Sequence, residues 1–172
     1  MIDFKNKTVL FIDMDGTLIK TASGKTFPED CSDFRIRLNV LDDIIIKMPN
    51  LQYLFIVTNQ AGIPQYMTKD DFIAKINAIT TFMRDYMTND DFITIDYEFC
   101  LNTDNSNINR KPNTGMLESH LDNWLLCNYD KSSMVMIGDA SGKKGDFSDS
   151  DKKTAENFDI DYIDIEEFLK IK

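Results

Sequence analysis

The stretch FIDMDGTLIK at residues 11–20 decides the fold. It overlaps the run TVLFI (8–12), whose β-branched and aromatic residues are typical of a strand buried on both faces. Two aspartates, Asp13 and Asp15, then stand one residue apart before a Gly-Thr pair. Carboxylates at the end of a buried strand are costly unless a cation or strong hydrogen-bond donors hold them. The stretch therefore predicts a sheet protein with a charged site where its first strand ends.

Strand-like and helix-like segments alternate along the 172 residues. We expect strands at 8–13, 52–59, 93–101, 133–139 and 160–165. Apolar spacing predicts helices over 38–48, 68–87, 114–127 and 151–158, then a terminal helix, with a loop or short hairpin over 20–33. Thr68 is the expected N-cap of the second helix, with Asp71 three residues later. This order predicts an α/β protein with a parallel sheet, and the length predicts one domain, 1–172.

Composition narrows the class of protein. The chain has 29 acidic and 19 basic residues and a net charge of −10, which disfavours broad non-specific binding to nucleic acid. We find neither an apolar run long enough to span a bilayer nor a secretory signal pattern, so we expect an intracellular protein outside the membrane. The cysteines lack metal or disulfide spacing and are expected in the core: Cys31, Cys100 and Cys127.

Polar residues follow several of the predicted strands. Thr58 and Asn59 end the second strand, Asp139 ends the fourth, and Lys111 lies in the loop after the third. In open parallel sheets, ligands bind beyond the carboxyl ends of the strands. Each feature has an ordinary alternative, namely capping acids in a turn or a solvated lysine. Their joint occurrence at strand ends favours one shared site.

These residue types suit phosphoryl transfer. One of the paired carboxylates, Asp13 or Asp15, can act as nucleophile or metal ligand while the other moves protons. Asp13 and Asp139 offer the oxygen ligands that Mg²⁺ prefers. A Thr58 hydroxyl could hold a phosphoryl oxygen, and Lys111 could neutralise charge that develops during transfer.

Four segments resemble motifs of the haloacid dehalogenase superfamily: FIDMDGTLI (11–19), VTNQAG (57–62), RKP (110–112) and IGDASG (137–142). A closer resemblance is to the polynucleotide 3′-phosphatases, the phosphatase part of kinase–phosphatases that heal DNA ends. It rests on GTLIKTASGKTFP (16–28), NRKPNTGM (109–116) and GDASGKKGDFSDSD (138–151). The resemblance implies a three-layer, Rossmann-like fold with no large cap domain.

The resemblance also implies roles. Asp13 would form an aspartyl-phosphate, and Asp15 would protonate the leaving oxygen and then activate water. Mg²⁺ would be held by Asp13, Asp139 and the backbone carbonyl of Asp15, with a second acid at Asp151 or, as second choice, Asp146. The expected substrate contacts are Asp13, Gly16, Thr17, Thr58, Asn59, Arg110 and Lys111.

The expected substrate is a nucleic-acid end, most naturally DNA, carrying a 3′-phosphate, and we expect a monomer. The gaps between motifs leave no room for a large cap, and an open site suits a bulky terminus. Phe27 and Tyr66 could stack on a base, or could serve as loop anchors. Cations near the strand ends could guide the strand: Lys20, Lys25, Arg35, Arg37 and Arg110.

Other functions compete with this one. A small-molecule phosphatase of the same superfamily, acting on a sugar phosphate or histidinol phosphate, often carries a cysteine- and histidine-rich zinc loop, and 102–109 has neither residue. A catalytically silent binding module should have lost Asp13, Asp15 or Lys111. A protein phosphatase would share the DxDGT motif but not the SGKTFP or RKPNTGM segments. The single histidine, His120, is expected to be structural.

Overall fold

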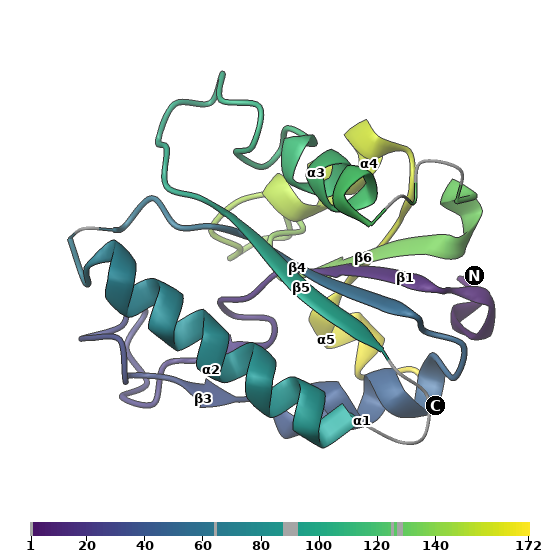
Figure 1. The fold of residues 1–172 in the computed structure, drawn as a ribbon, viewed down its shortest axis with the longest axis horizontal. Coiled ribbons are helices and arrows are strands. Elements are labelled where there is room, and N and C mark those ends of the chain that lie inside the picture. The colour runs from purple at the N-terminus through teal and green to yellow at the C-terminus, as the bar shows by residue number, and fades with distance from the viewer. Residues whose placement is uncertain (1, 64, 88–92, 125, 127–128) are drawn as a thin grey trace.

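The computed structural model describes residues 2–63, 65–87, 93–124, 126 and 129–172. One sheet has the strand order β5-β4-β1-β6-β7, with every neighbouring pair parallel (Figure 1). Its strands are β1 (Val9–Ile12), β4 (Tyr53–Asn59), β5 (Thr94–Cys100), β6 (Met134–Gly138) and β7 (Asp161–Asp164). A two-stranded antiparallel pair, β2 (Ile19–Lys20) and β3 (Arg35–Ile36), flanks the segment predicted as a loop or short hairpin. The predicted parallel sheet is confirmed, with each strand end within one residue of its expected position.

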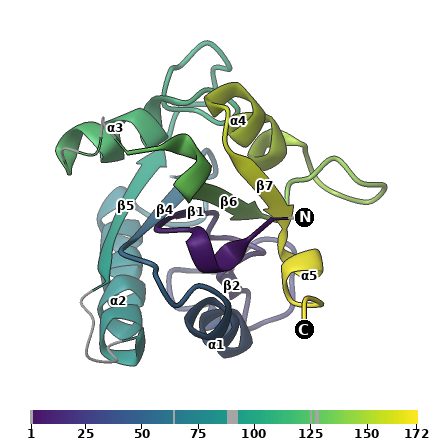
Figure 2. The ribbon, with the colours of Figure 1, turned by 90° about the vertical axis from the view of Figure 1, so that its right-hand side faces the viewer.

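Helices cover both faces of this sheet, as Figure 2 shows. The helices are α1 (Leu38–Lys47), α2 (Lys69–Met87), α3 (Gly115–Asn123), α4 (Ser150–Phe158) and α5 (Ile165–Phe168). Short 3₁₀ turns, η1 (Phe4–Asn6) and η2 (Lys131–Ser133), precede β1 and β6. Helices α1, α2 and α5 lie on one face, and α3 and α4 lie on the other. The fold therefore has three layers.

Alternation along the strands explains the two cores. Leu10 and Ile12 of β1 pack in the cluster that contains α1, α2 and α5 side chains. Val9 and Phe11 point the opposite way, into the cluster with α3 and α4. Because both faces of β1 are covered, its sequence is continuously apolar rather than alternating.

Two helix ends test the sequence reading. The predicted cap of α2 is confirmed, because Thr68 Oγ1 accepts a hydrogen bond from the Asp71 amide at 3.1 Å. The helix expected over 114–127 instead ends at Asn123. There the chain turns, and the Trp124 indole donates to Asp96 Oδ2 on β5 at 3.0 Å. The apolar pattern extends past this turn, and Leu126 is buried in the second core. The last predicted position, Cys127, lies outside the described residues.

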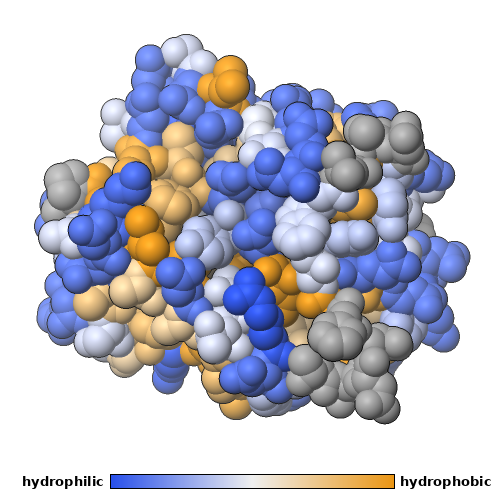
Figure 3. All heavy atoms as spheres, in the orientation of Figure 1, coloured by the Kyte–Doolittle hydropathy of each residue, from blue (hydrophilic) through white to orange (hydrophobic). Residues whose placement is uncertain are grey.

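The described chain has no large cap over the strand ends, as predicted. Between β1 and β4 it adds only β2, β3 and α1, and between β4 and β5 its described part adds only α2. Hydrophilic residues cover much of the face shown in Figure 3, with smaller apolar patches among them. None of the described helices is long and apolar enough to cross a membrane. The two described cysteines are free, with Cys100 buried and Cys31 half-buried.

Candidate active site

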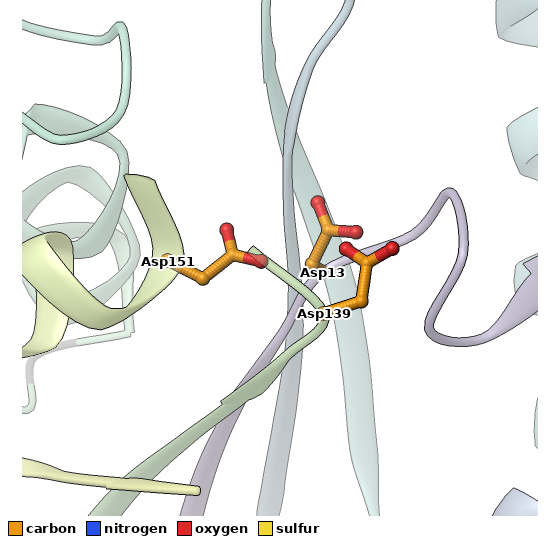
Figure 4. Close-up of side chains that lie close together, drawn as sticks. All are labelled: Asp13, Asp139 and Asp151. Atoms are coloured by element: carbon orange, nitrogen blue, oxygen red, sulfur yellow. The ribbon is translucent and has the colours of Figure 1, made fainter. Parts of the chain in front are cut away.

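Two strands and one helix bring three acidic residues together. Asp13 directly follows β1, Asp139 directly follows β6, and Asp151 lies in the first turn of α4. Figure 4 shows the three side chains converging at the ends of the strands. One carboxylate oxygen from each lies within 4.8 Å of the other two. These residues form what we call the acid cluster.

Lys111 inserts its ammonium group into this cluster. Its Nζ donates to Asp13 Oδ1 at 2.6 Å, to Asp151 Oδ1 at 2.7 Å and to the Val57 carbonyl at 2.9 Å. Burial alone would lower the pKa of Lys111, but the carboxylates of Asp13 and Asp151 raise it above its usual range. The ammonium is therefore protonated, and all three of its hydrogens have acceptors.

Asn59 fixes the backbone from which Lys111 projects. The Lys111 amide donates to Asn59 Oδ1 at 3.0 Å, and Asn59 Nδ2 donates to the Lys111 carbonyl at 3.0 Å. Asn59 was expected among the substrate contacts, but its amide group is used to hold the loop after β5. This pairing places the lysine against the end of β4.

The acid cluster carries more negative charge than Lys111 can balance. Burial raises the pKa of Asp13 well above its usual value; Lys111 opposes the shift, and Asp151 and Asp139 add to it. Asp139 is exposed as a residue, but desolvation of its carboxyl group raises its pKa to about 6, with Asp151 adding to the rise and Lys111 opposing it. A bound cation would relieve this repulsion. Carboxylate oxygens at this spacing fit the ligand preference of Mg²⁺.

Two glycines make room for the carboxylates. Gly16 has φ +84°, and a Cβ on it would lie 2.0 Å from Asp139 Oδ2. A Cβ on Gly138 would lie 2.2 Å from Asp151 Oδ2. Only glycine fits such close approaches, so the turn after β1 and the end of β6 are shaped around the acids.

Asp15 lies at the edge of the acid cluster and differs from Asp13 in its surroundings. Asp13 is 7% exposed, whereas Asp15 faces solvent. Gln60 Nε2 donates to Asp15 Oδ2 at 2.5 Å and to Thr58 Oγ1 at 2.9 Å. Thr58 itself is buried. Gln60 was not among the predicted site residues, because its side chain is uncharged and so did not suggest a catalytic or ligand-binding role. Only its position in the segment VTNQAG (57–62), which resembles a family motif, pointed to it.

Arg37 has a different task from the one expected. Its Nη1 donates to the carbonyls of Gly16 at 2.9 Å and Thr17 at 3.3 Å, and its Nη2 pairs with Glu166 at 2.8 Å. The guanidinium therefore stabilises the Gly16–Thr17 turn through these hydrogen bonds, whereas the sequence predicted that it would guide a nucleic-acid strand. Thr17 is fully buried, and its hydroxyl has no hydrogen-bond partner among the described residues.

Other expected residues lie outside the acid cluster. Asp146 accepts from Ser141 Oγ at 2.7 Å and from the Lys143 amide at 2.8 Å, so it closes the loop after β6. The structure thus brings Asp151 and not Asp146 to Asp13 and Asp139. Arg110 donates to the Asn102 carbonyl at 3.0 Å and so braces its own loop.

The two aromatic residues expected to stack on a base contact each other. Phe27 stacks on Tyr66 with ring centroids 5.5 Å apart and an interplanar angle of 8°. Phe27 remains 50% exposed. His120 is buried within α3 and stacks on Phe55 of β4 at 4.3 Å, consistent with the expected structural role.

The chain is similar to known phosphatases along most of its length. Residues 8–169 match the model of a family described as polynucleotide kinase 3 phosphatase. A bifunctional polynucleotide phosphatase/kinase from Schizosaccharomyces pombe is 33% identical over 167 residues, covering 96% of this chain and 38% of that protein. The histidine biosynthesis bifunctional protein HisB from Legionella pneumophila is 29% identical over 168 residues, covering 92% of this chain and 41% of that protein. The chain thus spans about two fifths of the length of both relatives.

A solved structure supports the fold. The D,D-heptose 1,7-bisphosphate phosphatase from B. bronchiseptica, crystallised with magnesium and phosphate, gives a TM-score of 0.59 at 14% identity. The match covers 91% of this chain and 92% of that one. The predicted haloacid dehalogenase fold is confirmed.

Proposed function

Because the chain belongs to the polynucleotide kinase 3 phosphatase family, we propose that this phosphatase removes phosphate from 3′ ends of nucleic acid, with DNA as the preferred substrate. The observation that carries the proposal is the acid cluster of Asp13, Asp139 and Asp151 around Lys111, in a chain that matches this family over residues 8–169. The product would be a 3′-hydroxyl end that a polymerase or ligase can use.

The reaction would proceed in two displacements. A carboxylate oxygen of Asp13 attacks phosphorus, the bond from phosphorus to the 3′-oxygen breaks, and Asp15 gives its proton to that oxygen. Asp15 then takes a proton from water while the water oxygen attacks the phosphorus of the aspartyl-phosphate. Inorganic phosphate leaves, and both aspartates return to their starting states.

The surrounding residues would bind the phosphoryl group. Lys111 faces Asp13 directly and can balance negative charge on the transferred group. The buried Thr58 hydroxyl can donate to a phosphoryl oxygen. The Gly16–Thr17 turn and Arg110 are further proposed substrate contacts.

Mg²⁺ would be held by the side chains of Asp13 and Asp139 and the backbone carbonyl of Asp15, with Asp151 as the second acid. When bound, the ion would neutralise phosphoryl charge and hold the group in line with Asp13. The excess negative charge of the acid cluster supports this assignment. The magnesium and phosphate in the related heptose bisphosphate phosphatase structure agree with it.

Two observations support a nucleic-acid end as substrate. The described strand ends carry no large cap, so a long strand could reach them. The stacked pair of Phe27 and Tyr66 offers an exposed ring to a base. The net charge of −10 favours recognition of the terminus over extended contact with a duplex.

A second candidate is a small-molecule phosphatase, because HisB is similar in sequence and the heptose bisphosphate phosphatase has a similar fold. The deciding experiment compares four substrates with Mg²⁺ and with a chelator. They are a deoxyoligonucleotide with a 3′-phosphate, the same strand with a 5′-phosphate, histidinol phosphate and p-nitrophenyl phosphate. Release from the 3′-phosphate strand and not the 5′-phosphate strand, lost with chelator, would support the proposal.

Turnover of histidinol phosphate with neither strand touched would move the substrate to a small molecule. Asp13→Asn is the control for both outcomes. It should abolish turnover while keeping the fold, because the side chain keeps its shape and loses its nucleophilic oxygen.

A further inference from the structure

Gln60 joins two parts of the site that come from different strands. Its Nε2 has two hydrogens, and one goes to Asp15 Oδ2 at 2.5 Å while the other goes to Thr58 Oγ1 at 2.9 Å. Asp15 belongs to the turn after β1, and Thr58 belongs to β4. The amide therefore spans the gap between neighbouring strand ends.

The backbone of Gln60 is also held by a hydrogen bond. Its amide donates to the Cys100 carbonyl at 2.7 Å, which continues the pairing of β4 and β5 one residue past Asn59. The contact with Thr58, a buried residue, then fixes the orientation of the side-chain amide. Both the backbone and the side chain of Gln60 are therefore held in place by hydrogen bonds to the sheet.

Asp15 has no comparable support of its own. It faces solvent, and Gln60 supplies the one side-chain hydrogen bond that it accepts within the described part of the chain. An exposed aspartate side chain would otherwise sample several rotamers. Proton transfer needs its oxygen within hydrogen-bond reach of the reacting group, so such freedom would slow the reaction.

We propose that Gln60 is a positioning residue that holds the Asp15 carboxyl group in place for proton transfer. The proposal rests on the proposed function only as far as phosphoryl transfer from an ester, not on nucleic acid as substrate. The Gln60 amide donates to Oδ2 and leaves Oδ1 of Asp15 without a hydrogen bond from the described residues, so Oδ1 can face the reacting group.

The test uses two esters of similar shape and different leaving groups, phenyl phosphate and p-nitrophenyl phosphate. Phenolate is the more basic leaving group and needs the proton more. Gln60→Leu should lower kcat/KM for phenyl phosphate by about 10- to 100-fold and for p-nitrophenyl phosphate by about threefold or less. Gln60→Ala should show the same difference, which guards against an effect of leucine itself.

Gln65→Leu is the matched control, because Gln65 is exposed in the loop that also contains Gln60. It should leave both kcat/KM values near those of the wild type. Equal losses for the two esters in the Gln60 variants, or no loss, would overturn the proposal. If the wild type releases no phosphate from 3′-phosphorylated DNA, the proposed function is overturned. The comparison of the two aryl esters would still test the role of Gln60.

Discussion

Lys111 and Asp13 form a buried ion pair, with Lys111 Nζ 2.6 Å from Asp13 Oδ1 and the two side chains 2% and 10% exposed. A second carboxylate, from Asp151, lies 2.7 Å from the same ammonium and is 1% exposed. In the proposed reaction this pairing would serve both the fold and the chemistry. It neutralises part of the acid cluster and places a fixed positive charge where phosphoryl charge would develop.

Replacing Lys111 by methionine should therefore cost both stability and activity. Lys111→Met keeps the side-chain length but leaves two buried carboxylates without their cation, which should lower the free energy of unfolding by about 3 to 5 kcal/mol. Lys143→Met is the control, because Lys143 is about half exposed in its ion pairs. It should cost less than about 1 kcal/mol. Urea unfolding measures both, and a Lys111→Met protein as stable as the wild type would contradict this account.

Removing Asp139 should weaken the response to Mg²⁺. Without metal, Asp139→Asn should unfold at a higher temperature than the wild type, because it removes one of three clustered negative charges. Saturating Mg²⁺ should stabilise the wild type, by about 2.7 kcal/mol at 100 times Kd, and stabilise Asp139→Asn much less. Asp146→Asn should keep the wild-type response. A full response in Asp139→Asn would remove Asp139 from the metal site.

His120 should make stability depend on pH in mildly acidic solution. Its burial lowers its pKa from 6.5 to about 4, so the folded protein keeps the ring neutral while the unfolded chain takes up a proton. Stability should therefore fall as the pH falls from about 6.5 to about 4, by about 3 kcal/mol from this residue.

The variant His120→Phe isolates this contribution, since phenylalanine can keep the stacking on Phe55 and cannot be protonated. Unfolding free energies of the two proteins, measured across that pH range, should diverge as the pH falls. Parallel curves would show that His120 does not titrate differently in the folded and unfolded states.

Loss of the exposed Phe27 ring should affect turnover of DNA and not of a small ester. Phe27→Ala removes a surface on which a base could stack, so KM for the 3′-phosphorylated strand should rise about tenfold. KM for p-nitrophenyl phosphate should stay unchanged. Phe82→Ala, an exposed aromatic residue on α2, is the matched control. Equal effects on both substrates would assign Phe27 to loop structure alone.

Much of this architecture could be predicted because the strands are short, apolar and followed by polar residues. The run before Asp13 and the run before Asp139 fixed two strand ends, and parallel pairing brings such ends to one edge. Sequence ranked Asp151 above Asp146 only through the family resemblance, since both lie in one acidic stretch. The choice depends on the start of α4 and on the space that Gly138 leaves.

The contributions of Arg37 and Gln60 were beyond the reach of sequence reasoning for a different reason. An arginine near a proposed phosphate site suggests a ligand contact, but the Gly16 and Thr17 carbonyls take up its donors once the turn has formed. Gln60 is neutral, and its importance depends on two acceptors that come from separate strands. Only three-dimensional contacts show either set of hydrogen bonds.

The most direct measurement follows the phosphate itself from substrate to enzyme. A deoxyoligonucleotide with a radioactive 3′-phosphate would be mixed with the enzyme and Mg²⁺, quenched in acid during turnover, and the protein digested. The account predicts radioactivity on the peptide that contains Asp13, and none when Asp13→Asn is used. Release of the 3′-phosphate without labelled protein, or label on another residue, would contradict it.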